Sequence, residues 1–346
     1  MMKKLLYIAS AVALVACGSS KETANTDNDA TTDQAAKYAK TITAKDLGKH
    51  LFIYASDEFE GRDTGESGQK KAVKYLKDFY VSQGITSPLG GDDYFQEVPS
   101  EYLSDNRRGI TLKDSENVVA FIKGTEKPEE VVVISAHLDH EGVKNGKIYN
   151  GADDDGSGTV AILEIAEAFK QATDAGKGPK RSILFLHVTG EEKGLLGSKY
   201  YTENPIFPLA NTVTNLNIDM IGRVDDRHKG NPNYVYLIGS DKLSTELHNI
   251  SEAMNKKYSN IDLDYKYNDD NDPNRFYYRS DHYNFAKHNI PVIFYFNGTH
   301  ADYHRPTDTP DKINYEMLEN RARLVFHTAW EVANRENRVV VDKAVE

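Results

Sequence analysis

Two adjacent glutamates, Glu191 and Glu192, stand between an apolar run and a glycine-containing turn. One carboxylate of such a pair can bind a metal ion while its neighbour, pointing elsewhere, stays free to move protons. Other residues of metal-binding type lie before and after the pair, namely His137, Asp154, Asp219 and His304. Histidine nitrogen with carboxylate oxygen and no thiolate suits zinc, or less specifically cobalt or manganese. The combination predicts a hydrolase that activates water on metal.

The neighbours of these candidates suggest supporting roles. Asp139, two residues after His137, is placed to hold that imidazole in its metal-binding tautomer. Asp154 lies within three consecutive acids, whose mutual repulsion would be costly without a cation, although Asp153 or Asp155 could be a helix cap. We expect the remaining histidines to be surface or core residues, including His140, His187 and His282.

Short apolar runs that read as buried strands place these candidates. They are 131–135, 182–188, 212–218, 234–238 and 292–296. Each candidate ends or follows such a run, except Asp154, which lies in a tight turn that opens a helix. Because open α/β sheets gather their sites at the carboxyl ends of strands, these side chains should meet.

Helical patterns alternate with the strands. Their predicted ranges are 68–83, 158–170, 242–256 and 315–334, and Thr43 is expected to cap a further helix. This alternation predicts an α/β fold, a three-layer sandwich with a mixed, mainly parallel central sheet flanked by helices on both faces. The segment 94–115 looks irregular and is too short for a separate domain.

The beginning of the chain reads as an export signal. Lys3 and Lys4 precede an apolar run that is too short to span a bilayer, and Leu14–Cys17 resembles the lipobox of bacterial lipoproteins. We therefore expect a signal peptide at 1–16, a lipid-anchored flexible tether at 17–37 and one catalytic domain at 38–346. An ordinary signal peptide with an incidental cysteine is the alternative.

Cys17 is the only cysteine, so its lipidation would leave no thiol for a disulfide. Gly18 replaces the acid that retains some lipoproteins at the inner membrane, which favours the outer membrane, on its periplasmic face or the cell surface. The net charge of −11 becomes −13 when Lys3 and Lys4 are removed, which argues against nucleic-acid binding. The sequence does not indicate an oligomeric state.

Several motifs in order carry a family resemblance. They are Ala136–His140, Gly151–Gly158, Thr189–Gly194, Ile218–Met220, Ser280–His282 and Asp302–His304, with Ala55–Arg62 ahead of them. Together they resemble the dizinc aminopeptidases, metallopeptidase family twenty-eight, from about Leu51 to Trp330. Each motif is weak alone, but their shared order makes chance an unlikely origin.

The resemblance implies two Zn²⁺ ions bridged by Asp154. His137 and Asp219 would complete one site, Glu192 and His304 the other, and Glu191 would be the general base. The substrates implied are peptides with a free N-terminus. The resemblance also places Asp281, in the Ser280–His282 motif, near the site. We expect it to contact a ligand rather than the metal, and the sequence assigns it no role.

Other functions fit the same pattern less well. Glutaminyl cyclases resemble the Glu191–Glu192 motif but not the acidic run 153–158, and carboxypeptidase or dipeptidase relatives are harder to separate. A non-catalytic binding protein on the same fold should show gaps in the ligand set, and this sequence has none. Asp269–Asp272 could bind calcium, but it lacks the spacing of a known loop and is more typical of a solvated loop.

Overall fold

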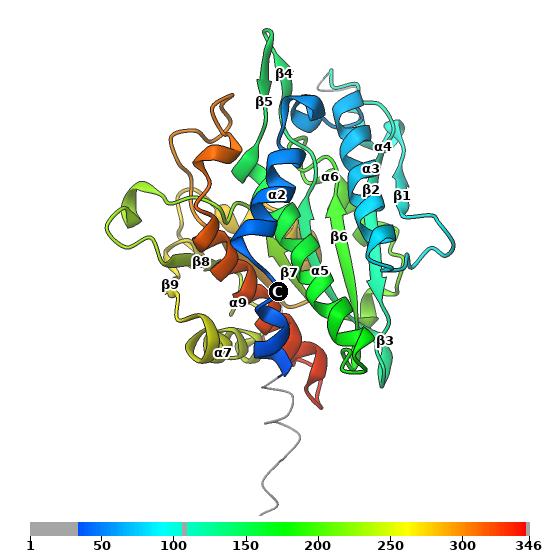
Figure 1. Ribbon diagram of the computed structural model, residues 1–346, viewed down its shortest axis with the longest axis vertical. Coiled ribbons are helices and arrows are strands. Elements are labelled where there is room, and N and C mark those ends of the chain that lie inside the picture. Colours follow the sequence, from blue (N-terminus) through cyan, green and yellow to red (C-terminus); the bar gives the residue numbers. More distant parts are fainter. Residues whose placement is uncertain (1–33, 106–108, 344–346) are drawn as a thin grey trace, which may run out of the picture.

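An eight-stranded mixed sheet forms the centre of the computed structural model, which describes residues 34–105 and 109–343. The strand order is β1-β2-β6-β3-β7-β10-β8-β9 (Figure 1). These strands are β1 (Phe95–Val98), β2 (Ser115–Ile122), β3 (Lys127–His137), β6 (Arg181–Val188), β7 (Thr212–Ile218), β8 (Tyr234–Ile238), β9 (Asp262–Asp264) and β10 (Val292–Phe296). A separate hairpin pairs β4 (Gly142–Lys144) with β5 (Lys147–Tyr149).

The four central strands β6, β3, β7 and β10 run parallel to one another. Strand β2 is antiparallel to β6, and β8 is antiparallel to β10. The parallel centre explains why the candidate ligands can converge, because the carboxyl ends of these strands share one edge of the sheet. The predicted mixed, mainly parallel α/β sheet is confirmed.

Helices cover both faces of the sheet. They are α2 (Ala44–Tyr54), α3 (Ser67–Ser82), α4 (Ser100–Leu103), α5 (Gly158–Asp174), α6 (Leu196–Glu203), α7 (Thr245–Met254), α8 (His282–Ala286) and α9 (Tyr315–Asn334). In Figure 1, α2, α5 and α9 lie in front of the sheet, and α5 and α9 contact β3 and β6. Helix α8 packs on β7 and β10 and contacts α6. None of the described helices has the length and apolar character needed to cross a membrane.

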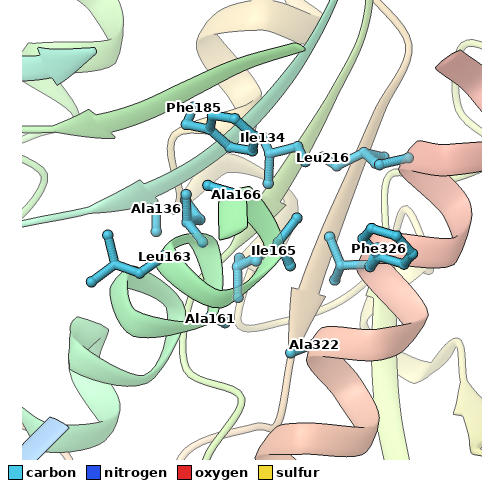
Figure 2. Packing of buried hydrophobic residues seen from close by; sticks show 14 of the residues in the cluster. Ile134, Ala136, Ala161, Leu163, Ile165, Ala166, Phe185, Leu216, Ala322 and Phe326 are labelled. Atoms are coloured by element: carbon cyan, nitrogen blue, oxygen red, sulfur yellow. The ribbon is translucent and has the colours of Figure 1, made fainter. Parts of the chain in front are cut away.

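Strand β3 shows why both faces must be covered. Val132 and Ile134 belong to the large core cluster that includes α5 and α9, whereas Val131 and Val133 pack in a second cluster with residues of α6 and α8. Successive side chains of a strand point to opposite faces, so a continuous apolar run requires a layer on each side. Figure 2 shows part of the first cluster, with residues of β3, α5 and α9 among the labelled side chains.

Several element boundaries follow local sequence signals. Thr43 accepts a hydrogen bond from the N–H of Asp46 and caps α2, as predicted. The segment 94–115 is less irregular than predicted, because it contains β1 and α4 and leads into β2. Residues 34–39 form a helix in which Ala35 is 2% exposed. The packed domain therefore includes residues that the predicted tether range 17–37 assigned to the linker, and the rest of that range lies outside the described residues.

Glu164 on α5 provides a stability prediction. Its side chain is buried, and this burial raises its pKa to about 8, with further contributions from Glu167 and Asp46. A carboxyl whose pKa is higher in the folded state stabilises the fold below its ordinary pKa, and this stabilisation is lost as the pH rises through about 8. Glu164→Gln mimics the protonated form at every pH.

We expect the advantage of Glu164→Gln over wild type in free energy of unfolding to grow by about 2–4 kcal/mol between pH 5 and pH 9. Urea unfolding of both metal-loaded proteins at the two pH values measures this difference. Glu129→Gln, at an exposed position of β3, is the matched control and should show no such growth. An advantage of Glu164→Gln that does not change with pH would contradict the prediction.

Candidate metal centre

The structure brings together all five side chains predicted to bind metal. His137 ends β3, Asp154 lies in the turn before α5, and Glu192 follows β6. Asp219 directly follows β7, and His304 lies in the loop after β10. His137, Glu192, Asp219 and His304 end or follow parallel neighbours in the sheet, so their side chains meet at one edge. Asp154 reaches the same edge from the turn between the β4–β5 hairpin and α5.

Asp154 stands between two groups of donor atoms. Its Oδ1 lies 3.2 Å from Nε2 of His137, which is 3.7 Å from Oδ1 of Asp219. Its Oδ2 lies 3.0 Å from Nε2 of His304, which is 3.4 Å from Oε2 of Glu192. The two oxygens of one carboxylate thus face two separate donor sets, which is the arrangement that the bridging role requires.

The donor set fits zinc. Several of its buried atoms have no hydrogen-bond partner among the described residues, namely Nε2 of His137, Oδ2 of Asp154 and Oε1 of Glu192. Buried polar atoms without partners are rare in folded proteins, because each one costs free energy of solvation. Imidazole nitrogens and carboxylate oxygens that converge in this way have the chemistry of a zinc site.

His140 also lies in this cluster, although the sequence analysis placed it outside the ligand set. Its Nδ1 is 2.8 Å from Oε1 of Glu192 and 3.8 Å from Oδ2 of Asp154. These three residues form a donor group of their own. The spacing from His137 in the sequence was the only available signal, and it does not show where the ring points.

The acids on either side of Asp154 have structural roles. Asp153 accepts hydrogen bonds from the N–H of Gly222 and the hydroxyl of Ser157. Asp155 accepts from the N–H groups of His137, Gly158 and Met220, so it ties the start of α5 to the ends of β3 and β7, while Ser157 is the N-cap residue of α5. Backbone donors therefore offset part of the repulsion that the sequence predicted, and Asp154 is left to face the donor groups.

Two further side chains hold the ligands in place. Asp308, which is fully buried, accepts hydrogen bonds from the N–H groups of Asp153 and Asp154. Ser280 donates its hydroxyl to Oδ2 of Asp219 at 2.6 Å. Such contacts fix the orientation of a ligand and are needed for tight metal binding. In the Ser280–His282 motif, the serine is thus the residue that touches a ligand.

Arg62 explains the opening motif. Its guanidinium is buried and donates to the backbone carbonyls of Leu138, Asn150 and Gly151. These carbonyls belong to the segments that carry His137 and Asp154. One arginine therefore clamps the two ligand-bearing loops together, a role for which the sequence offered no specific signal.

Asp139 differs from its predicted role. Nδ1 of His137 lies 3.0 Å from the backbone carbonyl of Asp139 but 3.9 Å from its carboxylate. The carboxylate instead accepts hydrogen bonds from the hydroxyl of Thr64 and the N–H of Glu191. Asp139 orients His137 through its backbone and holds the Glu191 backbone through its side chain.

Glu191 lies beside the ligands without joining a donor group. Its carboxylate has no hydrogen bond or ion pair within the described part of the chain, and it lines a cavity with Asp154 and Asp219. Burial raises the pKa of Glu191 well above its usual value, and the carboxylates of Asp219 and Glu192 raise it further, while His137 lowers it. A raised pKa suits a group that accepts and then releases a proton.

Asp281, the second residue of the Ser280–His282 motif, forms no hydrogen bond or ion pair with any of the five ligands. Its Oδ1 accepts a hydrogen bond of 2.5 Å from the hydroxyl of Ser198, while Oδ2 has no partner among the described residues. Burial raises the pKa of Asp281 to about 7. Its charge is one of the causes that raise the pKa of Glu191.

The electrostatics of the ligands favour cation binding. Burial lowers the pKa of His137, but Glu191, Asp154 and Asp219 outweigh it and hold that pKa well above the usual value. Burial raises the pKa of Asp154, but the neighbouring histidines outweigh it in the other direction. A metal that binds here must therefore displace a proton from His137.

A small cavity with aromatic and charged walls adjoins the donor groups. Besides site residues, it is lined by Met220, Phe276, Arg279, Phe294, Phe296 and Tyr303. Phe294 and Phe296 are two residues apart on β10 and share one face, while Met220 directly follows Asp219. The sequence gives no sign of this cavity, because its walls come from segments that only the fold brings together.

The acidic loop 269–272 does not join the metal centre. Asp269 accepts a hydrogen bond from the N–H of Asn271, and Asp272 accepts from those of Asn274 and Phe276. Asp270 forms an ion pair with Lys242. These contacts occupy carboxylate oxygens of all three aspartates, and Asp272 is buried in the loop.

The fold and the donor groups define a class of protein, an α/β protein with a candidate metal centre at the carboxyl edge of its central strands. Residues 117–329 match the profile of peptidase family M28, and this match spans more than half of the chain. The chain belongs to peptidase family M28.

Curated relatives agree with this assignment. The chain is 30% identical over 303 residues to leupeptin-inactivating enzyme 1 of Streptomyces exfoliatus, covering 81% of this chain and 59% of that protein. It is 35% identical over 131 residues to a vacuolar membrane protease of Verticillium alfalfae, covering 33% of this chain and 12% of that protein. The chain thus spans less than two thirds of the length of these relatives.

Solved structures share the fold. The LapA aminopeptidase of Legionella pneumophila superposes with a TM-score of 0.67 at 22% identity, covering 88% of this chain and 76% of that one. BSAP, a zinc aminopeptidase from Bacillus subtilis, superposes with a TM-score of 0.64 at 17% identity, covering 88% and 98%. At these identities the likeness concerns the fold alone.

Proposed function

We propose that this protein is a zinc-dependent aminopeptidase, an exopeptidase that hydrolyses the N-terminal peptide bond of peptides. One observation carries the proposal: two donor groups share the carboxylate of Asp154, and the carboxylate of Glu191 lies beside them without a partner in the described chain. The family supports a metallopeptidase, and the structural neighbours named above include aminopeptidases.

The proposed cofactors are two Zn²⁺ ions, with Co²⁺ or Mn²⁺ as substitutes. His137, Asp154 and Asp219 would hold one. Asp154, Glu192 and His304 would hold the other, since Nε2 of His304 lies close to both carboxylates. When bound, such ions polarise the scissile carbonyl and make a water molecule more acidic. The oxygen that Asp154 turns toward each group would keep the two ions close together.

Glu191 carries the proton in this proposal. Its carboxylate takes a proton from the attacking water as the water oxygen bonds to the carbonyl carbon. It then gives that proton to the nitrogen of the scissile bond, so the C–N bond breaks and an amine leaves. Asp139 supports this step because its side chain holds the N–H of Glu191 in place.

The cavity beside Glu191 supports action at the end of a peptide. It lies directly beside Asp154 and Glu191, and its aromatic walls and Met220 offer apolar contacts to a substrate side chain at its mouth. A peptide whose first side chain makes these contacts would place its first peptide bond at the metal centre. We therefore propose peptides with a free, apolar N-terminal residue as substrates.

We expect the zinc-loaded protein to hydrolyse aminoacyl p-nitroanilides, with apolar residues such as leucine and phenylalanine preferred over charged ones. A chelator should abolish the activity and added Zn²⁺ should restore it, because the donor groups are completed only by metal. The absorbance of released p-nitroaniline measures the rate. N-acetylated versions of the same compounds serve as controls and should not react.

The same assay separates other reactions of this fold. Cyclisation of glutaminyl peptides without hydrolysis would indicate a glutaminyl cyclase, and cleavage of N-blocked peptides from the carboxyl end a carboxypeptidase. A protein that binds neither metal nor substrate would support a non-catalytic role. Any of these results would overturn the proposal.

We also propose that the protein is an exported lipoprotein anchored through Cys17, placed at the outer membrane. The motif Leu14–Cys17 supports this, and it lies outside the described residues. Mass spectrometry of the mature protein should show acyl chains on Cys17. In Cys17→Ser the protein should leave the membrane fraction, and an unmodified polypeptide mass in the wild type would contradict the anchor.

A further inference from the structure

His140 is a buried imidazole that the proposed ligand set leaves unused. The ring has no exposed surface, and Gly151 makes room for it, because a Cβ at that glycine would lie 2.5 Å from the ring. Gly151 also has a φ of +53°, so any other residue would be strained there as well. The turn that carries Asp154 is thus shaped around the His140 ring.

The described residues around the His140 ring leave its two nitrogens without hydrogen-bond partners. Neither ring nitrogen has a well-formed hydrogen bond within the described residues, although Nδ1 is 2.8 Å from Oε1 of Glu192. The two atoms are close but not aligned as donor and acceptor. A buried polar group without a partner is costly, so a native residue in this state calls for an explanation.

A cation shared by His140 and Glu192 would explain why Nδ1 and Oε1 lie close together without the alignment of a hydrogen bond. Lone pairs of ligands point at the ion rather than at one another. Two donors about 2.0–2.2 Å from a zinc ion at a tetrahedral angle are roughly 3.3–3.6 Å apart. The distances of His140 Nδ1 to Glu192 and Asp154, 2.8 and 3.8 Å, bracket this separation.

His304 faces the same two carboxylates. Its Nε2 lies 3.0 Å from Oδ2 of Asp154 and 3.4 Å from Oε2 of Glu192. The rings of His140 and His304 meet edge to face, with their centroids 5.7 Å apart. Two imidazoles therefore approach one pair of carboxylates, whereas His137 is the one histidine in the group with Asp154 and Asp219.

We propose that His140 is a further ligand, through Nδ1, of the metal ion held by Asp154, Glu192 and His304. This inference rests on the proposed function and adds a residue to its metal centre. The ion at His140 then has four protein ligands, and the ion at His137 has three. A site with three protein ligands keeps an open position, so the ion at His137 is the one that offers room for substrate.

Metal affinity tests the proposal without using activity. Chelator competition should show that His140→Ala binds one of the two Zn²⁺ ions about 100-fold more weakly and keeps the other, because one donor has been removed. Added imidazole should restore part of the lost affinity. His187→Ala is the matched control, since this histidine is also buried but contacts Tyr80 outside the metal centre.

A measurement on the wild type covers the case in which His140→Ala fails to fold. X-ray absorption of the protein with two bound Zn²⁺ ions counts imidazole ligands, and we expect three shared between the two ions, from His137, His140 and His304. A count of two, or wild-type affinity for both ions in a folded His140→Ala, would overturn the inference. Hydrolysis of aminoacyl p-nitroanilides by the wild type tests the proposed function separately.

Discussion

Glu191→Gln should lower kcat for an aminoacyl p-nitroanilide by about 10³–10⁴-fold while the protein keeps its full metal content. The amide has the shape of the carboxylate but cannot accept the proton of the attacking water. Glu191 lies outside the donor groups, and its side chain has no hydrogen bond or ion pair within the described chain. The substitution therefore removes a proton acceptor without removing a ligand.

Steady-state kinetics and elemental analysis on the same preparation measure the two quantities. Glu203→Gln, an exposed glutamate at the end of α6, is the control and should retain the wild-type kcat. Full turnover by Glu191→Gln with both metals bound would show that another group moves the proton. Loss of metal together with activity would instead place Glu191 among the ligands.

Asp154→Ala should remove both metal ions and lower kcat/KM by roughly 10⁴-fold or more, since the proposed catalysis depends on metal. Its carboxylate turns Oδ1 toward His137 and Oδ2 toward His304, so a single deletion damages both donor groups. No other described residue faces both groups in this way. The effect on metal content should exceed that of any other single ligand substitution.

His304→Ala is the variant to compare with Asp154→Ala, because His304 belongs to only one of the two donor groups. We expect it to lose about one ion per protein and to abolish activity, while Asp154→Ala loses two. Elemental analysis after dialysis gives the metal content, and circular dichroism checks that both variants are folded. Equal losses in the two variants would contradict the bridging role of Asp154.

The sheet was largely predictable from local patterns. Five of the eight strands of the main sheet appear in the sequence as short segments rich in apolar residues, because strands of a covered sheet bury apolar side chains. Strand β7 is the least continuous of these segments, since it alternates polar residues with Val213, Leu216 and Ile218. Strands β1, β2 and β9 were missed. Strands β1 and β9 lie at the edges of the sheet. Strand β1 lies within the segment 94–115, which has no clear period, and β2 begins where that segment ends.

The residues that support the ligands were harder to predict from the sequence. Ser280 and Arg62 hold ligands through contacts with residues 61 and 89 positions away in the chain, those with Asp219 and Gly151. Asp139 was predicted from its spacing, but the path of the chain decided that its carbonyl and not its carboxylate meets His137. Sequence spacing limits which residues are near one another but does not set the direction of a side chain.

The sequence by itself determined the class of fold, the family and the five candidate ligands with Glu191. These depend on residue type and on position at the ends of apolar strands, and both are visible in the chain. Only the tertiary structure decided that Asp154 faces two donor groups, that His140 joins one of them and that a cavity with aromatic walls lies beside Glu191. Each of these features depends on side-chain directions across loops far apart in sequence, which the packing of the whole sheet sets.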